Sequence, residues 1–129
     1  MGLGNPTVSK TITLPPTKNL KMFFQKAVEL LTDKTEPPMT VLIAHCGVFL
    51  LAKGEADFVL EIAEGLEKHD YRRMFLQPLE VAARRWKGET VHVNAMVSVV
   101  ADDVVKRALK LEVGNKLAAD GSNAVASGD

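Results

Sequence analysis

Residues 40–52 read TVLIAHCGVFLLA and form the longest nearly unbroken apolar run in the chain. Pro37-Pro38 precede the run and Lys53-Gly54 follow it. Its apolar side chains point in every direction, whether the run is read at the period of a helix or at that of a strand. A segment that is apolar on all sides must be covered on all sides. We therefore expect these residues to form the centre of the hydrophobic core.

We interpret the run as a buried helix, with Thr40 capping its start and Gly54 ending it in a left-handed conformation. The alternative is a hairpin of two short strands that turns at residues 45–47. Length favours the helix, because strands usually contain about 4–8 residues. The run also offers no strong two-residue hairpin turn.

The composition is that of a single soluble globular domain, with 129 residues, 47% hydrophobic and 25% charged. Sixteen basic and sixteen acidic side chains give no formal net charge, so an electrostatic partner must be sought in local patches. Cys46 is the only cysteine, which excludes an intramolecular disulfide and suits a reducing compartment. The first residues lack the apolar core of a signal peptide, and no apolar run has the ~20 residues that span a bilayer. We expect a cytoplasmic protein without a membrane partner.

The chain divides into three parts. Residues 1–16 are predicted to be an N-terminal arm with a short strand, in which Val8, Ile12 and Leu14 alternate with polar residues. A lone strand is not stable in water, so these three side chains are candidates for self-association. Residues 17–113 are predicted to form a helical domain. Residues 114–129 are small and polar, and we expect a flexible tail.

Amphipathic spacing predicts further helices at about 17–33, 55–68, 70–87 and 102–113. Asp70 is a suitable N-cap for the third of these, Pro78 should make it kink or restart, and Gly88 should end it. The first should bury the face formed by Leu20, Phe23, Phe24, Ala27, Leu30 and Leu31.

Residues 91–99 alternate between apolar and polar types and are rich in valine, which predicts a second strand that pairs with the arm. A helical stripe of Val93, Met96, Val97 and Val100 is the alternative. The sequence therefore favours a mainly α fold, an α-rich α+β domain of four to five helices with one or two short strands.

Two blocks of opposite charge adjoin in the middle of the chain. Residues 55–67 contain five acids and no base, and residues 68–87 contain six bases against Asp70 and Glu80. Arginines beside a tryptophan can contact phosphates and stack on bases. The candidates for binding an anionic partner are Arg72, Arg73, Arg84, Arg85, Trp86 and Lys87. The alternative, which we favour, is that the two blocks pair with each other, within one chain or between subunits.

We assign no catalytic, metal or cofactor site. His45 and Cys46 are metal-ligand types, but adjacent helical residues point about 100° apart and do not converge on one ion. A reactive thiolate needs a partly open, electropositive setting, whereas Cys46 stands in the most apolar part of the chain.

The first functional hypothesis is a non-enzymatic interaction or assembly subunit, which self-associates or docks in a larger protein complex such as a viral or other shell. The second is a nucleic-acid-binding accessory or regulatory protein that uses the basic helix 68–87. A small enzyme is the third.

Overall fold

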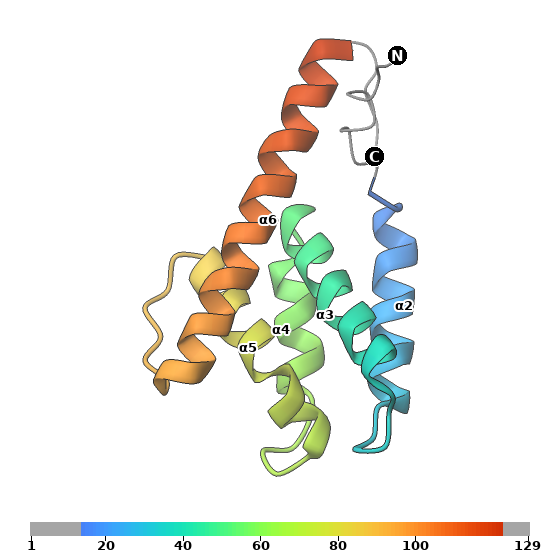
Figure 1. Cartoon of the computed structure of the whole chain (residues 1–129), viewed down its shortest axis with the longest axis vertical. Coiled ribbons are helices and arrows are strands. Elements are labelled where there is room, and N and C mark those ends of the chain that lie inside the picture. Colours follow the sequence, from blue (N-terminus) through green and yellow to red (C-terminus); the bar gives the residue numbers. More distant parts are fainter. Residues whose placement is uncertain (1–13, 123–129) are drawn as a thin grey trace.

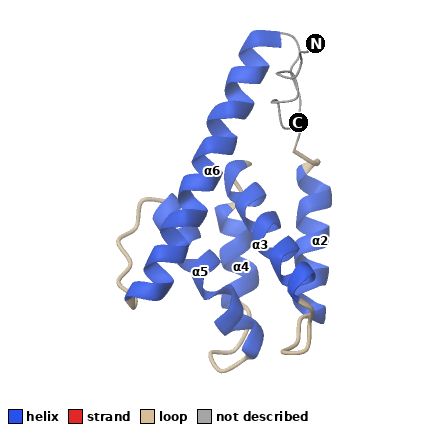
Figure 2. Ribbon diagram, viewed as in Figure 1, coloured by secondary structure: helices blue, strands red, loops and turns tan. Residues whose placement is uncertain are grey.

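The computed structural model describes the chain from residue 14 to residue 122, and the side-chain surroundings as far as Gly114. Figure 2 shows helices and loops in this part and no strand. The prediction of a mainly helical fold is confirmed, whereas the predicted strands are not found in the described residues. In chain order the helices are α2 (Thr17–Leu30), α3 (Pro37–Ala52), α4 (Ala56–Glu64), α5 (Tyr71–Trp86) and α6 (Ala95–Ser122).

Helix α3 occupies the centre of the bundle (Figure 1), where it contacts α2, α4, α5 and α6. The predicted helix over residues 40–52 is therefore confirmed and the hairpin is excluded. The helix begins earlier than predicted, at Pro37, because proline is well suited to the first helical turn. Thr40 is not the cap: its hydroxyl lies inside the helix and donates to the Pro37 carbonyl at 2.8 Å.

Gly54 ends α3 as predicted, with a positive φ of 81°. The Glu55 N–H donates to the Leu50 carbonyl at 2.8 Å, and the Gly54 N–H donates to the Leu51 carbonyl at 2.9 Å. These two bonds are those of the Schellman motif, which satisfies carbonyls that a helix end leaves without partners. Gly88 ends α5 in the same way, with a φ of 92°.

One cluster of buried apolar side chains joins all five helices. Its largest fully buried members are Phe24 and Val28 of α2, Ile43, Leu50 and Leu51 of α3, Val59 of α4 and Leu76 of α5.

The predicted buried face of α2 is partly wrong. Phe23 is 39% exposed and Leu30 is 68% exposed, whereas Val28, which was not included, is buried. Helix α2 packs mainly against α3 alone, so only a narrow stripe of it is covered. The helix ends at Leu30, three residues before the predicted end, because Leu31 has an extended backbone.

Helix α5 begins and ends close to the positions predicted from the sequence. The Asp70 carboxylate accepts a hydrogen bond from the Arg72 N–H at 2.9 Å and caps the helix, as predicted. Pro78 lies inside a single continuous helix, so the chain does not restart there. Because proline has no N–H, the Met74 carbonyl receives no intrahelical bond from that position.

The strand predicted for residues 91–99 is wrong. Residues 91–94 form a loop, and α6 begins at Ala95. The Asn94 side-chain oxygen accepts from the Val97 N–H at 2.9 Å, which is the geometry of an N-cap. Helical spacing then buries Ala101, Val104 and Ala108 against the bundle. The segment is therefore helical from Ala95, but the predicted helical stripe is not its buried face, because Met96 is 78% exposed, Val100 is 44% exposed and Val93 precedes the helix.

The predicted bounds of the last helix were also wrong. Helix α6 runs from Ala95 to Ser122, so it includes residues 114–122, which the sequence assigned to the tail. It packs against α5 and α3, and its C-terminal part extends beyond the other helices (Figure 1). None of the helices in the described part is long and apolar enough to cross a bilayer. The first predicted strand falls almost wholly on residues 1–13, outside the described residues, and only Leu14 of it is seen, buried.

The close approach of α3 to α5 at Gly47 leads to the first prediction. A Cβ atom at Gly47 would lie 2.7 Å and 2.8 Å from the two methyl groups of Leu79, which is itself buried. Gly47→Ala should therefore lower the free energy of unfolding by about 1–3 kcal/mol, through overpacking. Gly114→Ala in α6 is the control, because a Cβ there meets nothing within 4 Å. It should leave stability unchanged or raise it by up to about 1 kcal/mol. Urea unfolding measures both, and equal effects would contradict this account of the contact.

Candidate functional site

The acidic and basic blocks meet inside one chain, where α4 packs against α5. Arg84 of α5 pairs with Glu64 of α4, and Lys87 just after α5 pairs with Asp57 of α4. The Asp57 carboxylate raises the pKa of Lys87. Acidic side chains of α4 therefore lie opposite basic side chains of α5 and its C-terminal end along the contact between the two helices. This arrangement is the one expected for two charge blocks that pair with each other.

Arg73 forms an ion pair with two hydrogen bonds within α5. Its guanidinium donates two hydrogen bonds to the Glu80 carboxylate, both at 3.0 Å, and a third to the Leu66 carbonyl at 2.8 Å. The Glu80 hydrogen bonds raise the pKa of Arg73. Arg84 extends this network from the other side, 4.0 Å from Glu80 and 3.2 Å from Glu89. Such a network holds its planar groups in fixed orientations.

Arg85 joins α5, the loop of residues 89–94 and α6. It donates to the Val91 carbonyl at 2.7 Å, to the Ser98 hydroxyl at 3.0 Å and to the Asp102 carboxylate at 3.0 Å. Its side chain is largely buried, with 20% exposed. Arg85 therefore fixes the position of the loop that carries Val91 and Val93.

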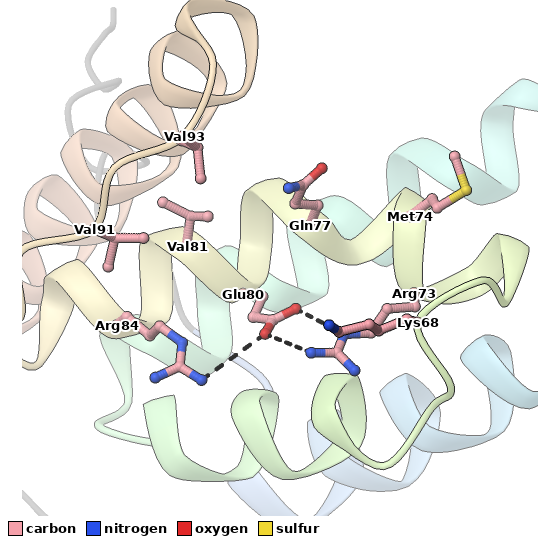
Figure 3. A pocket seen from close by; sticks show the side chains of 9 residues that line it. All are labelled: Lys68, Arg73, Met74, Gln77, Glu80, Val81, Arg84, Val91 and Val93. Carbon is pink, nitrogen blue, oxygen red and sulfur yellow. Dashed lines mark hydrogen bonds and ion pairs between the residues drawn. The ribbon is translucent and has the colours of Figure 1, made fainter.

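These contacts shape an open groove of about 340 Å³ along α5. Figure 3 shows Glu80 between Arg73 and Arg84, with Val91 and Val93 entering from the loop before α6. Its lining combines cationic, amide and apolar groups: Lys68, Arg73, Met74, Gln77, Glu80, Val81, Arg84, Val91 and Val93. We call it the α5 groove.

Two polar side chains of the α5 groove, Lys68 and Gln77, have no hydrogen-bond or ion-pair partner in the described part of the chain. The groove thus presents an unpaired ammonium and an unpaired amide beside apolar side chains. Such a combination can hold a carboxylate or phosphate next to an apolar group.

The structure brings two of the predicted anion-binding residues, Arg73 and Arg84, into the α5 groove. Arg72 instead pairs with Asp70 at 2.6 Å, and this hydrogen bonding lowers the pKa of Asp70 to about 2. The other three do not line it: Arg85, Trp86 and Lys87.

Sequence reasoning missed Lys68, Gln77 and Glu80 as members of the groove. A signal was present for Glu80, because it stands seven residues after Arg73, which is two helical turns along the same face.

A second surface is apolar. A hollow of about 160 Å³ lies where the end of α2 meets the start of α3, lined by Phe23, Lys26, Ala27, Leu30, Leu31, Thr35 and Met39. On α3 beside it, Val41 and Leu42 are each 52% exposed, and His45 is exposed one turn further. We call the exposed apolar side chains Phe23, Leu30, Met39, Val41 and Leu42 the α2–α3 face. Of the residues predicted for self-association, Val8 and Ile12 lie outside the described residues and Leu14 is buried.

The Cys46 thiol is enclosed by the core and donates to the Leu20 carbonyl at 3.3 Å. Burial raises its pKa from the usual 9.0 to about 12, so the nucleophilic thiolate is disfavoured at neutral pH. In the described residues, His, Cys, Asp and Glu side chains do not gather in groups of three or more that could hold a metal ion.

Comparison of the chain with protein-family models, with curated proteins and with solved structures found no match of any of the three kinds. The function is therefore argued from the surfaces of the molecule itself.

The contrast between the two neighbouring arginines gives the second prediction. Arg85→Gln should lower the free energy of unfolding by about 1–3 kcal/mol, because it removes charged hydrogen bonds to two other elements. Arg84→Gln, the matched control, should cost less than about 1 kcal/mol, since its ion pairs lie nearer the surface. Urea unfolding compares the variants, and an equal or larger loss for Arg84→Gln would contradict the role given to Arg85.

The Cys46 environment gives the third prediction. A thiol reagent should label Cys46 only after denaturant is added, and rapid labelling of the native protein would show that the thiol is not enclosed. Below pH 9 the thiol keeps its proton in both states, so its contribution to stability is complete there. Between pH 9 and about 12 only the unfolded state loses the proton. The free energy of unfolding should then fall by up to about 1.4 kcal/mol for each pH unit in this range.

Cys46→Ala is the control for this titration. It should remove the cysteine-dependent part of the fall above pH 9, and cost about 1 kcal/mol at neutral pH because it leaves a small cavity. Urea unfolding of both proteins from pH 7 to pH 11 measures the difference. If the free energies of unfolding of the two proteins change in parallel with pH, the raised pKa of Cys46 is contradicted.

Proposed function

We propose that the protein is a non-enzymatic interaction or assembly subunit, which self-associates or docks in a larger protein complex such as a viral or other structural shell. The observation that carries the proposal is the α2–α3 face. Helix α3 contains no Asp, Glu, Lys or Arg, yet it leaves Val41 and Leu42 half exposed.

This exposure is unusual for a helix at a protein surface. The outer face of such a helix normally carries charged or polar side chains, whereas a helix that is apolar all round is normally buried. On α3 the apolar surface continues across the hollow to Phe23 and Leu30 of α2. Contiguous exposed apolar surface of this kind marks protein–protein contacts.

The second candidate is a nucleic-acid-binding accessory or regulatory protein that uses the basic helix 68–87. Lys68, unpaired at the edge of the α5 groove, favours it. The ion pairs weigh against it, because Arg72, Arg73, Arg84, Arg85 and Lys87 each have a carboxylate partner in the chain. Neutralised cations release fewer counterions from a phosphate backbone, so the affinity for nucleic acid falls.

Multi-angle light scattering on the purified chain tests the first candidate and gives the fourth prediction. At high micromolar concentration the protein should have at least twice its monomer mass of 14.0 kDa. Association through an apolar face should persist in high salt, because salt does not screen the hydrophobic effect. A strictly monomeric protein at that concentration would exclude self-association, the first form of the proposal.

The same preparation separates the second candidate from the first. A nucleic-acid-binding protein should be retained on single-stranded DNA at low salt, and the double change Arg84→Gln with Arg85→Gln should weaken retention. If the wild-type protein is not retained on single-stranded DNA at low salt, this candidate is excluded.

A further inference from the structure

We infer that two copies of this chain pair side by side through the outer face of α6, with the two α6 helices antiparallel. This pairing rests on the proposed function, as a form of self-association, and adds a second surface to the α2–α3 face. Helices α6 and α2 lie on different sides of α3 (Figure 1), so the two surfaces are separate. The spacing, the exposure and the order of the side chains along α6 all support the pairing.

The outer face of α6 is the side turned away from the bundle. Ala101, Val104 and Ala108 are buried against the other helices, so the opposite side of α6 faces solvent. Between residues 95 and 114, the side chains on that opposite side are all exposed and fall within an arc of about 100°. We call them the α6 outer face: Met96, Val99, Asp103, Lys106, Lys110 and Val113.

The positions on the α6 outer face are separated alternately by three and four residues. This is the seven-residue repeat with which two helices pack along each other, because it keeps one side of each helix toward the partner. The face is about 26 Å long at the rise of an α-helix. Its apolar side chains are open to solvent: Met96 is 78% exposed, Val99 68% and Val113 52%. The described helices of the same chain therefore leave this repeat uncovered, and a second helix fits it.

The order of these side chains makes the face complementary to itself when one copy is reversed. In an antiparallel pair whose two-fold axis passes through the middle of the face, Met96 of each copy lies opposite Val113 of the other. Nearer the axis, Asp103 of each copy lies opposite Lys106 of the other. The ends of the contact are therefore apolar, and its centre contains two pairs of opposite charges.

Val99 and Lys110 complete the face. In the antiparallel pair they lie opposite each other, so the valine packs on the methylene groups of the lysine while the ammonium reaches water. A parallel pair would instead place every residue opposite its own equivalent, and Asp103, Lys106 and Lys110 would each meet a like charge. The charges therefore select the antiparallel arrangement.

The charged side chains of the face are available to a partner. Lys106 and Lys110 have no hydrogen-bond or ion-pair partner in the described part of the chain. Asp103 pairs with Arg107 of its own helix at 2.9 Å through Oδ2. The other oxygen of this carboxylate, Oδ1, can accept a hydrogen bond from the Lys106 ammonium of the second copy.

The remaining charges near the face do not prevent pairing. Asp102, which borders the outer face, is held by Arg85 of α5 at 3.0 Å. Residues 95–114 carry three acids and three bases, so with Arg85 included each copy has an excess of only one positive charge. Repulsion between two such copies is weak at physiological salt, where exposed charges are screened.

Charge reversal at the centre of the α6 outer face tests this inference and gives the fifth prediction. Every protein carries Leu42→Lys, which removes the α2–α3 face as an apolar contact, and light scattering over a concentration series measures its mass. The parent should be a dimer at high micromolar concentration, with twice the monomer mass of 14.0 kDa. Asp103→Lys or Lys106→Asp alone places like charges opposite each other at both central contacts. Either change should raise the dissociation constant of the dimer at least about tenfold.

Restoring the opposite charges should restore the dimer. A chain with both Asp103→Lys and Lys106→Asp should pair with itself, and a mixture of the two single variants should form a heterodimer. Both dimers should have dissociation constants within about threefold of the parent's. In a parallel pair the double variant would still oppose like charges, so its recovery also establishes the orientation.

Glu61→Lys is the control, because it reverses an exposed acid of α4, away from the α6 outer face. It should leave the dissociation constant of the dimer unchanged, and circular dichroism should show the same helix content in all of these proteins. The inference is overturned if the single variants dimerise as tightly as the parent, or if the double variant stays monomeric.

The Leu42→Lys background separates failure of this inference from failure of the proposed function. If the wild-type protein is oligomeric but the Leu42→Lys protein is monomeric, the α2–α3 face carries self-association, so the inference fails while the proposed function stands. If the wild-type protein is monomeric at the same concentration, the inference and self-association are both excluded.

Discussion

The fold depends on one requirement, that a helix without charged side chains be kept out of water. Helix α3 meets it only from Ile43 onward, where Ile43, Cys46, Leu50 and Leu51 are buried beneath the neighbouring helices. The hydrophobic effect drives this arrangement, and Gly47 permits it, because the missing side chain lets α5 approach closely. The other helices each cover one side of α3 and present their own charged residues outward.

Electrostatics then fixes how the outer helices are ordered. The acids of α4 face the bases of α5, and Arg85 binds α6 and the preceding loop to the same helix. Individual surface pairs contribute little, but a connected series of them favours one alignment of the helices over others. The charge blocks that suggested an external anionic partner are therefore used largely within the chain. Lys68 and the α5 groove are what remains exposed to a partner.

The sequence predicted those features that depend on local chemistry. These include the central helix, the Asp70 cap, and the helix ends at Gly54 and Gly88. It misjudged residues 91–99, because alternating valines satisfy a strand and also contain a helical stripe, and Asn94 as an N-cap decides between them. The α5 groove was only half predictable: the spacing of Glu80 from Arg73 on α5 was a usable signal, whereas Lys68, which precedes the helix, and Val91 and Val93, which follow it, join the groove through tertiary packing. Likewise, Phe23 and Leu30 lie on an apolar stripe, and only the shortage of neighbouring helices leaves them exposed.

That shortage connects the fold to the proposed assembly. An apolar helix at the centre of a bundle needs neighbours on every side, and the described helices leave Val41 and Leu42 uncovered. A chain that only had to fold could place polar residues at these two positions with little loss of stability, since neither is buried. Apolar side chains at these positions instead suit a protein–protein interface whose centre excludes water. In the proposed assembly, the exposed residues near the start of α3, Met39, Val41 and Leu42, belong to an interface rather than to the edge of a core.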